Sequence, residues 1–437
     1  MVGKAIAAAL LASTLATPAL ADPTTAEIAA ELAAMRAKIA SLEAQLAALR
    51  AAPEALAPAP PAPESRPAPK PAGSGGGVTV KPFGRLQYDV GHVESPRGVS
   101  DPGLGFGNEL RRARLGVEGT IPGGFGYKLE ADFADNQVEI TDAFFNYKAG
   151  KPLTLTLGQH NNFQSLEEVT SSRFLSFLER AAFTDAFGFE RRVGLSGTFA
   201  QGDVIAQAGI FTDNIDDLSR TDENDAIGAD ARLVYAPKLG ATQLHLGGSA
   251  HWRDSGDAAG TARYRQRPFV HTTDTRFLAT PALAVEEETS YGLEAALING
   301  PFHATGELHW LSAQTVPGAT PTFFGGYAEA GFFLTGETRG YKGGRWDRTK
   351  VLKPLGDGGF GALQVNLRYD RLDLSDDGVV GGTQSGFLAG LLWIPQDHVR
   401  FLLNYGRLSY RDAAVPAAGG DRDYSVNVVG ARAQVDF

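Results

Sequence analysis

The chain has 437 residues, no cysteine, a formal net charge of −10 at pH 7 and a mean hydropathy of −0.14. The lack of cysteine excludes disulfide scaffolds and thiol chemistry, and the acidic balance argues against nucleic acid as a partner. No stretch reaches the roughly 18 to 20 apolar residues that a membrane helix needs, although strands of alternating polarity cross membranes without one.

Residues 1–21 have the pattern of an export signal. Lys4 precedes an apolar run over residues 5–15, and a small-residue cleavage site ends at Ala21. An uncleaved membrane anchor is the alternative, but the apolar run is too short and no charged cluster follows it. We therefore expect cleavage after Ala21 and a mature chain outside the cytoplasm.

Residues 22–50 form the next unit, which we predict to be a periplasmic coiled-coil helix. Thr24 and Glu27 have the spacing of a capping box. Apolar residues then recur in steps of four and three: Ile28, Leu32, Met35, Ile39, Leu42, Leu46 and Leu49. This seam permits a trimer. An isolated amphipathic helix on a surface is the alternative, but the polar face is not basic enough for that role.

Residues 51–77 are rich in Pro and Ala and then in Gly and Ser, a composition that cannot build a core. We predict a semi-stiff spacer that ends in a flexible segment. The composition changes near Val78, so residues 78–437 are expected to form one domain.

This domain is predicted to be an all-β, 16-stranded antiparallel transmembrane barrel. Phe125, Tyr127 and Leu129 alternate with Lys128 and Glu130, and similar alternation recurs to the last residue of the chain. The expected strands are residues 78–90, 109–120, 124–134, 138–149, 152–160, 191–200, 203–211, 226–236, 241–252, 289–298, 302–312, 325–336, 360–374, 383–395, 398–409 and 424–437. A barrel of this size encloses an aqueous channel.

The connections indicate the topology. Links after even-numbered strands are mostly tight turns, whereas links after odd-numbered strands include the long segments 161–190 and 253–288. We therefore expect both barrel ends on the periplasmic side and the long loops outside. Segment 337–359 breaks the rule, and either a missed strand or an elaborated turn would explain it.

Arginines of the strands are candidates for an ion path. Strand parity points Arg85, Arg112, Arg114 and Arg232 into the lumen, whereas Arg111 has lipid-side parity and is expected near the rim. Guanidinium groups pair with phosphate or carboxylate and stay charged, so a row of them suits oxyanions. The alternative for any one of them is a charge neutralised by a neighbouring residue.

A second basic cluster lies in the long loop 253–288. Arg263, Arg265 and Arg267 share one face if the segment is extended. They could form a funnel for anions, and binding of lipopolysaccharide phosphates by a surface loop is an equally good interpretation.

Loop 161–190 is too apolar to lie in water, so we expect it to fold into the lumen and narrow it. There Arg173 and Arg180 would face Glu167, Glu168 and Glu179, a transverse field that selects by charge and size.

Several motifs resemble the phosphate-selective porin O and P family. They are Phe83–Gln87, Leu110–Gly116, Thr170–Arg173, Phe177 with Glu179 and Arg180, Arg191–Gly194 and Leu334–Tyr341. The resemblance covers about residues 78–437 and implies a trimeric, sixteen-stranded porin. It also implies that Arg85, Arg111 and Arg112 belong to an arginine ladder and central site, and that Arg173 stands where phosphate-selective members place a loop lysine.

The predicted function is an outer-membrane porin of a Gram-negative bacterium that passes small hydrophilic solutes passively, with a preference for anions such as phosphate. The alternative is a general or weakly cation-selective porin that also tethers the membrane to peptidoglycan or a periplasmic protein through residues 24–50. Expected partners are outer-membrane lipid, lipopolysaccharide, small anions and two further copies of the chain. The histidines are scattered, so we expect no enzyme, metal site or cofactor.

Overall fold

The computed structural model describes residues 40, 77–220, 226–256, 260–316 and 318–437. The predicted signal peptide and coiled coil, with nearly all of the spacer, lie outside the described residues. The chain beyond Ser74 forms one compact unit. No helix among the described residues has the length and apolar character needed to cross a membrane.

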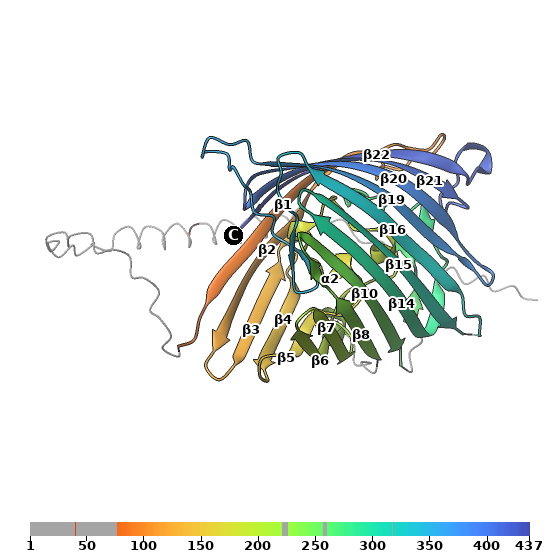
Figure 1. Ribbon diagram of the computed structural model, residues 1–437. Coiled ribbons are helices and arrows are strands. Elements are labelled where there is room, and N and C mark those ends of the chain that lie inside the picture. The colour runs from red at the N-terminus through yellow and green to blue at the C-terminus, as the bar shows by residue number, and fades with distance from the viewer. Residues whose placement is uncertain (1–39, 41–76, 221–225, 257–259, 317) are drawn as a thin grey trace, which may run out of the picture. The chain divides into compact units, whose positions relative to one another are not determined.

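Sixteen antiparallel strands form a barrel that closes by pairing of the first strand with the last (Figure 1). They are β1 (Lys81–Val93), β2 (Gly105–Ile121), β3 (Phe125–Asp132), β4 (Glu139–Lys148), β5 (Leu153–Asn161), β6 (Arg191–Gln201), β7 (Val204–Phe211), β8 (Ile227–Tyr235), β10 (Thr242–Asp254), β14 (Leu283–Asn299), β15 (Phe302–Thr315), β16 (Thr322–Phe333), β19 (Ala362–Asp376), β20 (Val379–Gln396), β21 (Val399–Arg411) and β22 (Tyr424–Asp436). The predicted number and order of strands are confirmed.

Short elements complete the fold. They are β9 (Lys238–Leu239), β11 (Gly260–Ala262), β12 (Arg265–Gln266), β13 (Leu278–Ala279), β17 (Gly340–Lys342) and β18 (Arg345–Asp347), with helices α2 (Leu166–Val169), α3 (Ala182–Ala186) and α4 (Ile215–Arg220) and the 3-10 turns η1 (Ala134–Asn136), η2 (Ser172–Phe174) and η3 (Ala418–Gly420). The expected start of the tenth wall strand at residue 289 is wrong, because β14 pairs with β15 from Val285 onward.

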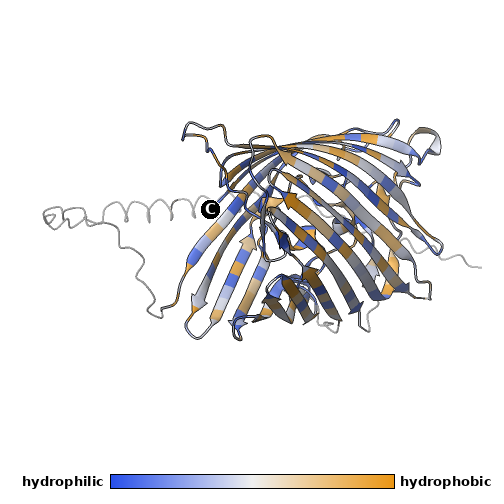
Figure 2. Cartoon of the chain, viewed as in Figure 1, coloured by the Kyte–Doolittle hydropathy of each residue, from blue (hydrophilic) through white to orange (hydrophobic). Residues whose placement is uncertain are grey.

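The side-chain pattern of the wall is inverted relative to that of a water-soluble protein. On β22, Val435 is 43% exposed, whereas Arg432 is 3% exposed, and Phe437 directly after the strand is 62% exposed. Figure 2 shows the alternation of apolar and polar residues along the wall. Because apolar side chains point outward along the strands of the barrel, its outer surface is suited to contact with lipid.

The inner surface has two unlike sides. Inward side chains of β14 to β22 are buried, whereas several inward side chains of β2 to β7, such as Arg114, Lys128 and Gln207, are only half-buried. The strands also differ, with 8 residues in β3 and in β7 but 18 in β20. The open space of the lumen therefore lies along the wall of shorter strands.

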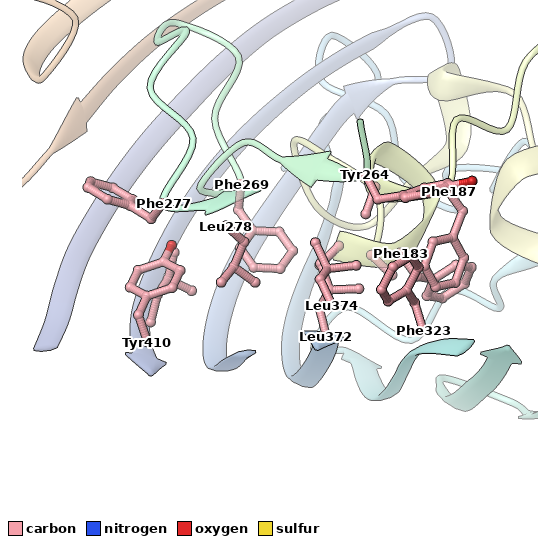
Figure 3. Packing of buried hydrophobic residues seen from close by; sticks show 14 of the residues in the cluster. Phe183, Phe187, Tyr264, Phe269, Phe277, Leu278, Phe323, Leu372, Leu374 and Tyr410 are labelled. Carbon is pink, nitrogen blue, oxygen red and sulfur yellow. The ribbon is translucent and has the colours of Figure 1, made fainter. Parts of the chain in front are cut away.

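Inserted segments fill the other side. Loop 161–190 enters from the end of the barrel with long loops, and its aromatic residues form a core inside the barrel with segment 253–288 and inward residues of the wall. Figure 3 shows this cluster, in which Phe183 and Phe187 of the loop lie near Phe323, Leu372 and Leu374 of the wall. The expectation that the loop folds into the lumen is thus correct.

Segment 337–359 enters from the opposite end, where the short turns lie. It contains the hairpin β17–β18, in which Tyr341 pairs with Trp346. This hairpin forms its own small sheet, separate from the barrel. Of the two explanations that the sequence left open, the elaborated turn is therefore the right one.

Candidate functional site

Backbone hydrogen bonds to acidic wall residues hold loop 161–190 in the lumen. The Glu307 carboxylate on β15 accepts from the backbone N–H groups of Leu166 (2.8 Å) and Glu167 (2.9 Å) at the start of α2. Asp370 on β19 accepts from the N–H of Ala182 over 3.1 Å, at the start of α3. Buried backbone N–H groups need hydrogen-bond acceptors, and the carboxylates of the barrel wall provide them for these groups of the loop.

Basic wall residues hold the carbonyl groups of the same loop. Arg400 donates to the carbonyl oxygen atoms of Arg173 and Leu175, the latter over 2.8 Å. Arg432 donates to the carbonyl of Leu178 over 2.7 Å, and the Oδ1 of Asn404 accepts from the Leu178 N–H over 2.7 Å. The loop is therefore attached on several strands at once.

Inward glycines make room for the loop. A Cβ built on Gly325 would lie 2.3 Å from the Cβ of Phe183, and one on Gly430 would lie 2.8 Å from Leu178. A Cβ on Gly390 would lie 3.0 Å from the ring of Phe177. The loop side chains therefore occupy positions that wall side chains would otherwise fill.

The loop acids do not form the transverse field that the sequence suggested. Glu167 pairs with Arg368 of the wall, which also contacts Glu329 at 2.6 Å. Glu179 pairs with Arg111 and with Arg432, each at 3.0 Å. These two acids form ion pairs with arginines of the barrel wall beneath the loop. The pairs attach the loop to the wall.

Glu168 is bound within the loop itself. Its carboxylate lies 3.2 Å from Arg180, which also donates to the carbonyls of Glu167 (2.9 Å) and Thr170 (2.9 Å). Burial raises the pKa of Glu168 above its ordinary value, and Arg180 only partly opposes this. Burial likewise raises the pKa of Glu167, against the effect of Arg368.

Glu179 behaves differently from the other two acids. Burial disfavours its charged form, but Arg111 and Arg432 outweigh burial and hold its pKa well below the ordinary value. Glu179 therefore remains ionised at mildly acidic pH.

Hairpin β17–β18 is fixed by both the wall and the loop. Tyr341 Oη lies 2.6 Å from His245 Nδ1, and Arg232 donates to the carbonyl of Gly344 over 2.9 Å. Trp346 donates its backbone N–H to Thr170 Oγ1, and the guanidinium of Arg339 lies 3.9 Å from the centroid of the Trp346 ring. Loop and hairpin thus occupy the lumen together.

Arg111 does not lie near the rim on the lipid side, so that expectation is wrong. A β-bulge shifts the pairing of β1 with β2, so that Gln87 faces Arg112 while Tyr88 faces Leu110. The extra residue is Arg111, whose side chain turns inward to Glu179. Strict parity failed because a bulge resets the alternation.

The predicted ladder residue Arg85 and the predicted lumen residues Arg114 and Arg232 point inward, but each pairs with a carboxylate. Arg85 pairs with Glu130 and donates to Ser172 Oγ over 2.8 Å. Arg114 pairs with Asp132 at 2.7 Å, and Arg232 pairs with Glu294 at 2.6 Å.

Arg112 and Arg173 differ from these arginines in their contacts. Arg112 donates to the Gln87 amide oxygen over 2.9 Å and contacts no carboxylate of the described residues. Arg173 is half-buried and lies 3.6 Å from Asp436.

The three arginines of segment 253–288 split into two groups. Arg263 and Arg265 are exposed, whereas Tyr264 between them is buried in the inner core. Arg267 pairs with Asp274 at 2.8 Å. The structure therefore leaves two of the three available to a solute at the end with long loops.

Among the described residues, no group of three or more His, Asp or Glu side chains could hold a metal ion. His160 instead contacts Ser196 at 2.7 Å, and His251 contacts Asp230 at 2.9 Å. These two histidines are parts of the inner hydrogen-bond network.

A family model described as phosphate-selective porin O and P matches residues 80–437. The chain belongs to this porin family. It is therefore an outer-membrane channel of a Gram-negative bacterium, and its family and fold are those of a channel rather than an enzyme.

Two curated relatives are similar in sequence to this porin. A protein of Caulobacter vibrioides, described as uncharacterized, is 54% identical over 376 residues, which cover 84% of this chain and 76% of the relative. Porin O of Pseudomonas aeruginosa is 28% identical over 310 residues, which cover 63% of this chain and 68% of the relative.

Solved porins share the fold. An anion-selective porin from Comamonas acidovorans superposes with a TM-score of 0.53 at 16% identity, over 83% of this chain and 100% of that one. OmpT of Vibrio cholerae in a trimer form superposes with a TM-score of 0.50 at 13% identity, over 82% and 99%.

The sequence reasoning missed lumen residues of this porin outside the predicted set. Arg345 and Arg348 belong to segment 337–359, whose place was open, and Asp436 is the second-last residue of the chain. Arg348 pairs with Asp436, and Arg345 is exposed. The run Tyr341–Arg348, with glycines at a tight turn, was the available signal of an inserted hairpin.

Proposed function

We propose that this porin lets small hydrophilic solutes diffuse passively along the open side of the lumen and prefers anions, phosphate-like oxyanions included. The observation that carries the proposal is a surplus of cations there. Asp142 pairs with Lys128 (2.6 Å) and Arg191 (2.7 Å), and Glu130 pairs with Lys128 (3.4 Å) and Arg85, so two carboxylates face three positive charges. Fixed positive charge in a narrow aqueous space attracts anions and repels cations.

The same imbalance recurs nearer to the loop. Asp436 is shared by Arg173 and Arg348. Arg345 is exposed, and no carboxylate of the described residues lies within ion-pair distance of it. The description of the matched family as phosphate-selective supports the same preference.

Several features of the mature protein belong to this proposal. Residues 1–21 are removed on export, residues 22–50 form a coiled coil, and residues 51–77 form a spacer to a barrel that starts near Val78. The short turns and both barrel termini face the periplasm, and the long loops face outward. Three copies form the functional porin, in line with the trimer form described for a structural relative.

The test is the single-channel current of the purified porin in planar bilayers. A reversal potential on the anion side under a KCl gradient, with block of chloride current by added phosphate, is the expected result. Anion preference without block would make the porin a general anion channel. A reversal potential on the cation side would overturn the proposal.

A second role as a tether is tested separately. Deleting residues 22–77 of the mature chain removes the proposed coiled coil and spacer but leaves the barrel. If the porin tethers the envelope, the deletion weakens the attachment of the outer membrane while conductance per channel stays the same.

A further inference from the structure

The two segments inserted into the barrel meet its last strand at one buried carboxylate. The Asp436 side chain on β22 is fully buried, and both Arg173 and Arg348 lie beside it. Arg173 belongs to the loop that enters at the end with long loops. Arg348 follows the hairpin that enters from the opposite end. One acid of the wall therefore faces an arginine from each insertion.

Arg348 occupies both oxygen atoms of this carboxylate. Its Nη1 donates to Asp436 Oδ1 over 3.2 Å, and its Nη2 donates to Oδ2. The same guanidinium donates to the carbonyl oxygen of Asp397 in the turn between β20 and β21. An arginine that holds both oxygens of a carboxylate has a more defined geometry than one with a single contact. Arg348 is therefore fixed against the wall.

The guanidinium of Arg173 is close to the same acid but forms no hydrogen bond with it. Its Nη1 lies 3.6 Å from Asp436 Oδ2, which is beyond hydrogen-bond length. Its Nε donates to Ser171 Oγ over 3.2 Å, and no described residue accepts a hydrogen bond from Nη1 or Nη2. The Arg173 side chain is 25% exposed. Its terminal donors are therefore available to a solute in the lumen.

The backbone of Arg173 is held in place. Its carbonyl oxygen accepts from Arg400 and from Gln434 Nε2, the latter over 3.2 Å. The ring centroid of Phe174 lies 5.2 Å from the guanidinium carbon of Arg173 and 5.3 Å from that of Arg348. Because the backbone is fixed, a small rotation of the side chain is enough to bring Arg173 into hydrogen-bond contact with Asp436.

The buried acid requires a counter-charge, since a buried carboxylate without a hydrogen-bonded cation is strongly unfavourable. Without Arg348, the nearest arginine that could take its place is Arg173. His398 lies farther away, at 3.9 Å, and is charged only when protonated. Arg85 faces the acid in the register of β1 with β22 but already pairs with Glu130. Arg173 would therefore turn to the acid, and its terminal donors would no longer be available to a solute.

We propose that Arg348 is a positioning residue for anion passage. By occupying Asp436, it keeps the guanidinium of Arg173 available to oxyanions in the lumen. Arg348 acts through Arg173 and not by contact with the solute. The inference rests on the proposed preference of the porin for anions, and it makes this preference depend on a contact between both insertions and the last strand.

The test is a double-mutant cycle on the block of chloride current by inorganic phosphate, measured with the purified mature porin in planar bilayers. Arg173→Gln and Arg348→Gln should each raise the half-blocking phosphate concentration about ten-fold, which corresponds to about 1.4 kcal/mol. The double variant should also show about a ten-fold rise, because either change alone already withdraws Arg173 from the solute. A rise of about a hundred-fold, the additive result, would overturn the proposal.

Two further variants separate positioning from the number of charges. Arg348→Lys keeps the charge but loses the planar fork that holds both oxygens, so phosphate block should weaken. An unchanged block in Arg348→Lys would reject the positioning role. Adding Asp436→Asn to Arg348→Gln removes the charge that captures Arg173 and should restore the block, and no recovery would count against the proposal.

Arg345→Gln is the matched control. It removes an exposed charge of the same inserted segment that forms no ion pair with Asp436 among the described residues. Its effect on phosphate block should add to that of Arg173→Gln. Equal non-additivity in this control would show that the cycle does not report on Asp436. All variants must keep the electrophoretic mobility of a folded barrel.

The structure of the Arg348→Gln variant gives a readout that does not depend on conduction. A terminal nitrogen of Arg173 should lie about 2.8 Å from Asp436 there. An Arg173 that keeps its present distance would overturn the proposal. Additive effects with an anion-side reversal potential reject the positioning role alone, whereas a cation-side reversal potential of the wild type rejects the proposed anion preference and this inference with it.

Discussion

The backbone N–H of Trp346 donates a hydrogen bond of 3.2 Å to Thr170 Oγ1, and this bond joins the two segments that enter the barrel from opposite ends. Thr170 ends helix α2 of loop 161–190, and Trp346 lies in β18 of the inserted hairpin. Because each segment is also bound to the wall, the two together close one side of the lumen. Solutes are left with the side bounded by the shorter strands.

Replacing Arg345 by Gln should weaken anion preference. Arg345 is exposed at the turn of the hairpin and forms no ion pair with the described residues, although Asp347 acts on it at longer range, so its charge acts on passing ions. We expect the anion-to-cation permeability ratio, measured from reversal potentials, to fall by about three-fold. Arg407→Gln, the same charge change on the outer face, is the control. An unchanged ratio in Arg345→Gln would remove this residue from the ion path.

Acidification should strengthen anion preference through Glu168. Burial raises the pKa of this acid, so Glu168 takes up a proton at a higher pH than a free glutamate does. Protonation removes a negative charge and leaves Arg180 without its carboxylate partner. The permeability ratio should therefore rise as the pH falls from about 7 to about 5.

Glu168→Gln should weaken that pH dependence, with a higher ratio already present at neutral pH, and any pH dependence that remains is assigned to Glu167, whose pKa burial also raises. Glu179 does not contribute, because its lowered pKa keeps it ionised over this range. Its stabilising contacts with Arg111 and Arg432 are present above the ordinary pKa of a glutamate and are lost only as the pH falls through the lowered value. The same pH response in wild type and Glu168→Gln would contradict the assignment.

Replacing Arg368 by Met should destabilise the barrel by about 3–5 kcal/mol, because Glu167 and Glu329 would be buried without a counter-charge. Unfolding by urea in detergent micelles measures the change. Arg371→Met lies on the outer face of the same strand and should change the free energy of unfolding by about 1 kcal/mol at most. Adding Glu167→Gln and Glu329→Gln to Arg368→Met should restore part of the loss; no recovery would refute the electrostatic cause.

Replacing Gly325 by Ala should displace helix α3 of the loop. The added Cβ would lie 2.3 Å from the Cβ of Phe183, and overpacking of this kind costs about 1–3 kcal/mol. We expect a lower unfolding midpoint and faster proteolysis of loop 161–190. Gly406→Ala is the control, since its Cβ would meet Leu388 at an ordinary 3.5 Å. Equal behaviour of the two variants would mean that the loop does not depend on this close contact.

The strand pattern could be read from the sequence because each wall residue has only two environments, lipid and lumen. Lys128, Glu130 and Asp132 alternate with apolar residues, and the structure places them inward as the period of two requires. The number and order of strands followed from counting such segments. The ends were less certain, as β14 shows, because strands can extend past the membrane into the loops.

The placement of Arg111 could not be read from parity alone. The bulge that turns it inward depends on the pairing of β2 with β1, and a sequence pattern carries only a faint trace of it: Leu110 and Leu115 both face outward although their positions differ by an odd number. The use of Glu167 and Glu179 as attachments also depended on which wall residues lie beneath the loop. Arg368 and Arg432, the residues they meet, are about 200 or more positions away in the chain.

By itself, the sequence determined that this protein is a sixteen-stranded barrel with a polar lumen, since alternation is a local property and every strand carries it. The tertiary structure alone decided which charges remain open to a solute. Both inserted segments have their places set by contacts between residues distant in the chain, such as Trp346 with Thr170 and Arg348 with Asp436. Because these contacts pair some charges and leave Arg345 without an ion pair among the described residues, the charges that a solute meets depend on the folded lumen and not on any one motif.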